Sequence, residues 1–124
     1  MPRLKIEISV PESHVEQVVE ALHAAGAGRT GEYARCSSVW RITGSWLPSP
    51  AARPHWGTAG EVERAEECRV ESFCERGQAA AVLAAVRAVH PYEEAVVNFL
   101  PLYDPLDDPL DDRLYDPLRD PAAG

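Results

Sequence analysis

The feature that most constrains the fold is a change of hydrophobic period that occurs twice along the chain. Apolar and polar residues alternate over residues 4–10, the period of a half-buried strand, and apolar residues then recur with helical spacing over residues 15–22. The same pair returns as an alternation over residues 68–74 and a helical stripe over residues 77–90. A chain with this pattern is expected to build two strand–helix units that share one core.

Boundary signals support these elements. Ser13 and Glu16 have the spacing of a capping box, which predicts the start of the first helix. Gly26 and Gly28 predict its end, because glycine accepts the left-handed conformation that closes a helix. Pro91 is expected to stop the second helix.

Two further strands complete the pattern. Residues 33–47 are rich in β-formers and predict a second strand, and residues 95–100 predict a short last strand. The proline- and glycine-rich residues 48–60 predict a long loop before a third strand over residues 62–75. The order is β-α-β-β-α-β, which predicts an α+β, ferredoxin-like domain over residues 1–102, an antiparallel sheet with two helices on one face.

Residues 103–124 have a different composition. Asp recurs there every four residues beside Pro and Leu, and the prolines exclude a helix interior. Residues 101–124 hold seven Asp and two Arg, which supplies −5 of the formal net charge of −8. We expect an acidic, flexible Asp-Pro-Leu tail. It is either a solvated segment or a repeated motif whose leucines dock into a protein partner.

Composition narrows the partners and the compartment. The net negative charge opposes binding to nucleic acid, since phosphates would be repelled. No apolar run reaches the roughly 18–20 residues of a membrane span, and the N-terminus has no apolar signal core, so a cytoplasmic protein is expected. The cysteines, Cys36, Cys68 and Cys74, are expected to be reduced, with the last two on one face of a strand.

Three ordered motifs are more specific than these patterns. They are GAGRTGEYARCS at residues 26–37, GTAGEVERAEECRVE at residues 57–71, and HPYEE at residues 90–94. Together they resemble the PII/CutA-like domain inserted in many bacterial proteins of the NIF3 family, which also occurs as a stand-alone protein. We expect the stand-alone form here, with the match covering about residues 3–102.

The resemblance implies a PII/CutA-like version of the predicted fold. Relatives of this fold commonly form trimers and bind small molecules or metals in clefts between subunits, near the loop that here covers about residues 44–60. The di-metal catalytic body of the family lies outside the insert, and its ligand motifs are not found in this sequence. The resemblance therefore implies a module that is not an enzyme. It also implies a homotrimer.

The sequence departs from the family pattern at three positions within the match. Ala95 stands where proline usually follows HPYEE, Ser38 replaces an aromatic residue, and Trp56 replaces an aliphatic one. The tail has no counterpart in the pattern. These departures bear on ligand specificity more than on the fold.

Candidate ligand-binding residues follow from the motifs and from the long loop. They are Tyr33, Cys36, Gly44, His90, Tyr92, Glu93 and Glu94. HPYEE has a structural interpretation, in which His90 caps the second helix and Tyr92 packs its ring, and a functional one. In the functional one, Cys36, His90 and Glu93 bind a divalent metal as an N/O/S ligand set.

Other catalytic and phosphate-binding patterns have less support. The glycines of residues 26–31 follow a helix instead of opening one, so turn chemistry is preferred to a phosphate loop. A Cys36–His90 dyad is the only nucleophilic pair to consider, and no orienting acid accompanies it. Trp40, Trp46 and Trp56 gather around the second strand and the loop, and at least one is expected at a subunit interface.

Two functional hypotheses remain. One is a ligand-responsive PII-like module that binds a small molecule or a divalent metal between subunits, with no certain cofactor. The other is a structural interaction protein whose oligomer presents several copies of the acidic tail to a partner.

Overall fold

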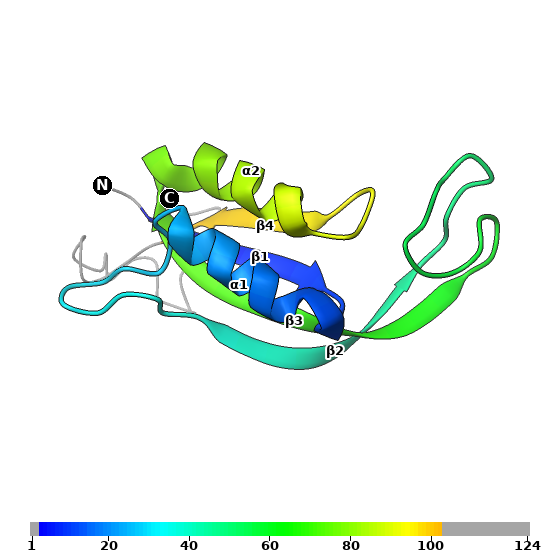
Figure 1. Cartoon of the computed structure of the whole chain (residues 1–124), viewed down its shortest axis with the longest axis horizontal. Helices are drawn as coiled ribbons and strands as arrows, with labels where there is room; N and C mark the ends of the chain where they lie inside the picture. The colour runs from blue at the N-terminus through cyan, green and yellow to red at the C-terminus, as the bar shows by residue number, and fades with distance from the viewer. Residues whose placement is uncertain (1–2, 103–124) are drawn as a thin grey trace, which may run out of the picture.

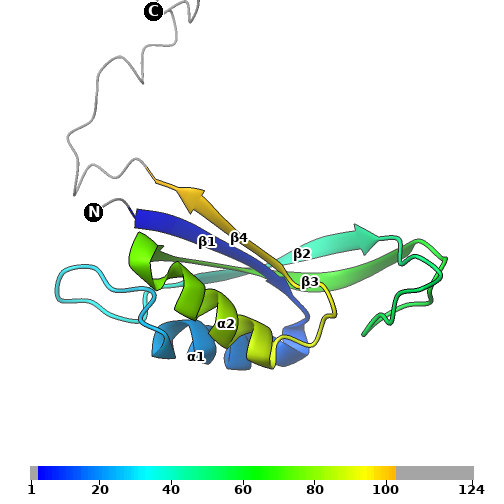
Figure 2. The ribbon, with the colours of Figure 1, turned by 90° about the horizontal axis from the view of Figure 1, so that it is seen from above.

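The computed structural model describes residues 3–102, which form one sheet with two helices on one face (Figures 1 and 2). The elements are β1 (Arg3–Val10), α1 (Val15–Ala24), β2 (Ser38–Trp46), β3 (Glu63–Glu75), α2 (Ala79–Val89) and β4 (Val96–Pro101), with 3-10 turns at Glu12–His14 and Arg76–Gln78. The strand order is β2-β3-β1-β4 and every neighbouring pair is antiparallel. The predicted ferredoxin-like α+β fold is confirmed. The predicted acidic tail lies outside the described residues.

The core lies between the sheet and the helices. Every second residue of β1, and of β3 over residues 68–74, points into it, as the period-two pattern requires. The fully buried side chains are Ile6, Ile8, Val10, Val18, Leu22, Val70, Val82 and Val86. Cys68 and Cys74 are free, buried thiols on the core side of β3, and burial raises the pKa of both. They pack as small apolar side chains, as expected.

The predicted capping box at the start of α1 is wrong. Glu12–His14 form a 3-10 turn, and α1 begins at Val15 without a side-chain cap. Ser13 instead places its Oγ 2.8 Å from Nδ1 of its neighbour His14, so its hydroxyl is not turned to the helix end. A capping box does occur before α2, where the backbone N–H of Glu75 donates to Oε1 of Gln78 at 2.9 Å.

The second strand is shorter than the predicted residues 33–47. Residues 28–36 form a small loop instead, in which Cys36 donates its backbone N–H to the carbonyl of Gly28 at 2.9 Å. Gly28 has a φ of 83°, and a Cβ there would lie 2.7 Å from the carbonyl oxygen of Cys36. Only glycine fits this close approach, which supports turn chemistry for the glycine motif.

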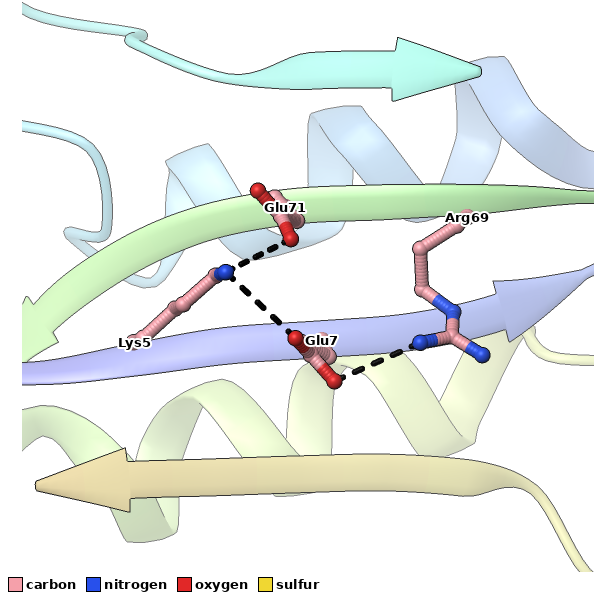
Figure 3. A network of polar contacts seen from close by, with 4 residues as sticks. All are labelled: Lys5, Glu7, Arg69 and Glu71. Carbon is pink, nitrogen blue, oxygen red and sulfur yellow. Dashed lines mark hydrogen bonds and ion pairs between the residues drawn. The ribbon is translucent and has the colours of Figure 1, made fainter. Parts of the chain in front are cut away.

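The sheet face away from the helices carries a charged network (Figure 3). The Nζ of Lys5 lies 2.7 Å from Oε1 of Glu71 and 3.4 Å from Oε1 of Glu7, and the hydrogen bond to Glu71 raises the pKa of Lys5. Nη1 of Arg69 lies 3.3 Å from Oε2 of Glu7. This open face is therefore polar at its centre and lacks the apolar packing of the helix-covered face.

The long hairpin of β2 and β3 extends beyond the end of β1 (Figure 1). β1 ends at Val10, which pairs with Cys68, so residues 63–67 of β3 pair with β2 alone. The loop that follows β2 folds back, and the ring of His55 comes 5.8 Å from that of His14. The hairpin and its loop thus form an arm, which we call the β2–β3 arm. A cleft lies near the base of this arm. No helix within residues 3–102 is long and apolar enough to cross a membrane.

Candidate functional site

The candidate site is a cleft of about 680 Å³ between the β2–β3 arm, its loop and the segment that joins α2 to β4. Its lining includes Gly44, Trp46, His55, Trp56, Glu67, Arg69, Tyr92, Glu93 and Glu94. This volume lies within the range of roughly 300–1,000 Å³ that is usual for small-molecule pockets. The lining combines aromatic rings with a small number of charged groups, which is typical of such pockets.

His90 fixes the segment behind the cleft. Its imidazole is buried, its Nε2 lies 2.7 Å from the carbonyl oxygen of Ser9, and its Nδ1 accepts the backbone N–H of Tyr92 at 3.1 Å. Because a carbonyl only accepts, Nε2 carries the proton and the ring is neutral. Burial lowers the pKa of His90, although the hydrogen bond to Ser9 opposes this effect. The ring therefore ties HPYEE to the end of β1.

Tyr92 turns this segment toward the arm. Its hydroxyl donates to Oε2 of Glu67 at 2.9 Å, across the space left by the end of β1. Burial raises the pKa of Tyr92, with the hydrogen bond to Glu67 acting in the same direction, so the hydroxyl keeps its proton. The Tyr92 ring lies 6.1 Å from that of Trp46 and 6.0 Å from that of His55, measured between centroids. Tyr92 thus links the carboxylate and the rings of the cleft.

Glu67 is the buried charge of the site. Only 6% of this residue is exposed. Its side chain lies across Gly44 on the neighbouring strand, where a Cβ would overlap Oε1. Gly44 is thus required because it leaves room for the carboxylate.

The structure brings together most of the residues that the sequence predicted. Gly44, Tyr92, Glu93 and Glu94 line the cleft, and the ring of His90 lies 5.0 Å from that of Tyr92. The structural interpretation of HPYEE placed the His90 ring at the end of α2, whereas its Nε2 contacts the carbonyl oxygen of Ser9 on β1.

Tyr33 and Cys36 do not join this group. Both belong to the loop after α1, and the carbonyl of Cys36 accepts a hydrogen bond from Oγ of Ser72 at 2.7 Å. Ser72 pairs with Ile6, three residues from Ser9 on β1, which is roughly 10 Å along the strand. Cys36 is therefore placed apart from His90. Within residues 3–102 no group of three or more His, Cys, Asp or Glu is arranged to hold a metal ion.

Sequence reasoning missed Glu67 and His55 as members of the site. Glu67 was inside the second motif, but its burial depends on Gly44 across the strand pair and on Tyr92 from a distant segment. Of the three tryptophans, at least one of which was expected at a subunit interface, Trp46 and Trp56 line the cleft. Gly44 pairs with Ala65, and the Glu67 side chain reaches over it diagonally from two residues further along β3, so no local pattern in the sequence indicated this contact.

Comparisons with known proteins agree with the fold. No family model matches the sequence. The chain is 39% identical over 98 residues to a GTP cyclohydrolase 1 type 2 homolog of Halalkalibacterium halodurans, covering 79% of this chain and 26% of that protein. It is 43% identical over 95 residues to the homolog of Mycobacterium tuberculosis, covering 77% and 25%. The chain thus spans about a quarter of the length of the curated relatives it matches.

Solved structures give the class of the domain. A Bacillus cereus protein related to NIF3 superposes with a TM-score of 0.73 at 33% identity, covering 83% of this chain and 26% of that one. The CutA of Archaeoglobus fulgidus, described as a periplasmic divalent cation tolerance protein, gives 0.62 at 18% identity, covering 82% and 85%. The PII-like protein CutA of Nostoc sp. PCC 7120 gives 0.59 at 12% identity, covering 85% of each.

The fold is that of PII/CutA-like domains. The chain has this fold and is similar in sequence to one segment of a NIF3-related protein, as the three motifs predicted.

Proposed function

We propose that this domain is a non-catalytic, PII-like module that binds a small molecule in the cleft and associates with further copies of itself. The observation that carries the proposal is the cleft beneath the β2–β3 arm, where a buried carboxylate and several aromatic rings converge. Such convergence of polar groups in an otherwise apolar hollow is the usual character of a binding site. A divalent metal is the alternative ligand, and the scattered donors of the described residues favour an organic molecule instead.

Self-association is supported by the open sheet face. Trp40, Val96 and Leu100 are 43%, 47% and 40% exposed and pair with Arg69, Ser9 and Lys5 on the side away from the helices. Exposed apolar side chains around a charged centre suit an interface between proteins. We propose a second copy as the occupant, in a trimer. A ligand site between subunits stays a prediction from the sequence.

Thermal unfolding of the 124-residue chain tests ligand binding. A panel of divalent metals, nucleotides and small amines, acids and heterocycles is added at high concentration. A ligand at about 100 times its Kd stabilises the folded state by about 2.7 kcal/mol and should raise the Tm by several degrees. Trp46→Leu should reduce the shift, whereas Tyr33→Leu, far from the cleft, should leave it unchanged. A panel that gives no shift, or a shift indifferent to Trp46, would contradict binding in the cleft.

Light scattering tests self-association. A trimer would have three times the mass of the 13.6 kDa chain. Trp40→Glu should dissociate it by placing a charge in the interface, and Val62→Glu, on the exposed loop, should not. A monomeric mass at micromolar concentration would reject the interface.

A further inference from the structure

The Glu67 carboxylate has an unusual position among the charges of the domain. It is almost fully buried, yet none of the ion pairs formed within residues 3–102 includes it. Tyr92 donates to Oε2, and Oε1 accepts no hydrogen bond from the described residues. A buried carboxylate without a cation is costly, so a positive group delivered to Oε1 would be strongly favoured.

The protein does not supply that positive group within the cleft. Arg69 is the one arginine in the lining, but its Nη1 pairs with Glu7 at 3.3 Å and its Nε is buried without a hydrogen-bond partner. Glu93 and Glu94 add two carboxylates at the exposed rim. Three carboxylates and one engaged guanidinium make the cleft negative, which opposes phosphate-bearing and carboxylate-bearing ligands.

The rings beside Glu67 suit a cation that also has an apolar part. Tyr92 and Trp46 are tilted by 44°, and Tyr92 and His55 by 48°, so the three form a bent wall instead of a closed stack. Aromatic faces attract cations, tryptophan most of all. They also remove apolar surface from water when an organic group packs on them.

From this arrangement we infer that the cleft binds a small organic cation, an ammonium or amidinium that bears an apolar group. Its N–H donates to Oε1 of Glu67 while its apolar group packs on the rings of Trp46 and Tyr92. The inference rests on the proposed binding function and names the chemical class of the ligand. A bare divalent ion fits less well, because no group of three donors is arranged for it in the described part of the chain.

Three fragments of nearly equal size separate charge from shape: benzylammonium, benzyl alcohol and benzoate. Each is titrated at pH 7 into the ¹⁵N-labelled full chain, and the tryptophan indole N–H signals are followed by NMR, with Trp46→Phe identifying the signal of Trp46. We expect benzylammonium to bind roughly tenfold more tightly than benzyl alcohol, as a charge-assisted hydrogen bond in a buried site predicts, and benzoate to bind most weakly.

Variants assign this preference to the carboxylate. Glu67→Gln keeps the shape and an acceptor for Tyr92 but removes the charge, so benzylammonium and benzyl alcohol should then bind equally. Glu66→Gln makes the same change on the next residue of β3, which is exposed and outside the cleft, and should leave the tenfold preference intact. Gly44→Ala places a Cβ on Oε1 of Glu67 and should also remove the preference.

The outcomes are distinct. A preference for the cation that Glu67→Gln abolishes supports the inference. Equal binding of the three fragments, or tightest binding of benzoate, overturns it and leaves the proposed binding function standing. If no fragment moves the Trp46 signal at millimolar concentration, the inference also fails, and the thermal panel decides separately whether another class of ligand binds.

Discussion

The two ends of β3 bury different kinds of side chain. Along residues 68–74 the strand faces the helices, and Val70 and its neighbours across the sheet, such as Ile8, are completely buried. At residue 67, where β1 has ended, the strand buries a glutamate against Tyr92. The end at residues 68–74 is stabilised by the burial of apolar surface, to which many side chains contribute. The end at residue 67 depends on single polar contacts, so the loss of one hydrogen-bonding atom should destabilise it.

The largest loss of stability is expected from a substitution in the helix-covered end of the sheet. Ile8→Ala removes a fully buried side chain from the centre of β1 and leaves a cavity. We expect a loss of about 2–5 kcal/mol in the free energy of unfolding, measured by urea denaturation. Val62→Ala, at an exposed loop position, should change it by less than about 0.5 kcal/mol. A small loss at Ile8 would mean that the core is not the main source of stability.

The sequence predicts these two ends unequally for a physical reason. Periodicity is a local property, so the strand over residues 68–74 and the helical stripe over residues 15–22 could be read directly. The cleft depends on contacts between distant segments, as in the hydrogen bond between Tyr92 and Glu67. HPYEE and Gly44 could be named as candidates, but the burial of Glu67 follows only from the early end of β1 and from the folding back of the loop.

The next effect belongs to the polar end. Tyr92→Phe removes the hydroxyl that donates to Glu67 and leaves the buried carboxylate without that donor. The expected loss is about 1–3 kcal/mol in the free energy of unfolding, again by denaturation. Tyr33→Phe removes a hydroxyl from a residue that is 75% exposed and should have no measurable effect. Equal stability of the two variants would show that the contact with Glu67 contributes nothing.

A smaller effect should appear as a pH dependence. Burial lowers the pKa of His90 from its usual 6.5, so below pH 6.5 the unfolded chain binds a proton that the folded chain does not. The stability that this residue contributes is complete above pH 6.5 and is lost as the pH falls below it. Denaturation at pH 7.5, 6.5 and 5.5 measures this trend.

His90→Gln is the control for this trend, because glutamine can still donate to Ser9 but does not titrate. The wild-type chain should lose more stability between pH 7.5 and 5.5 than the variant does. The same loss in both proteins would assign the trend to other groups and reject a buried neutral imidazole.

The smallest effect is expected at the surface, outside both ends. Glu12 pairs with Arg41 at 2.7 Å, but the two side chains are 66% and 69% exposed. In such a pair, solvent screening and the entropy of holding two long side chains cancel most of the attraction. Glu12→Gln should therefore change the free energy of unfolding by less than about 0.5 kcal/mol, by denaturation at low salt. A loss as large as that of Tyr92→Phe would mean that exposed charges stabilise this domain as much as buried ones, and the distinction between the two ends of β3 would no longer hold.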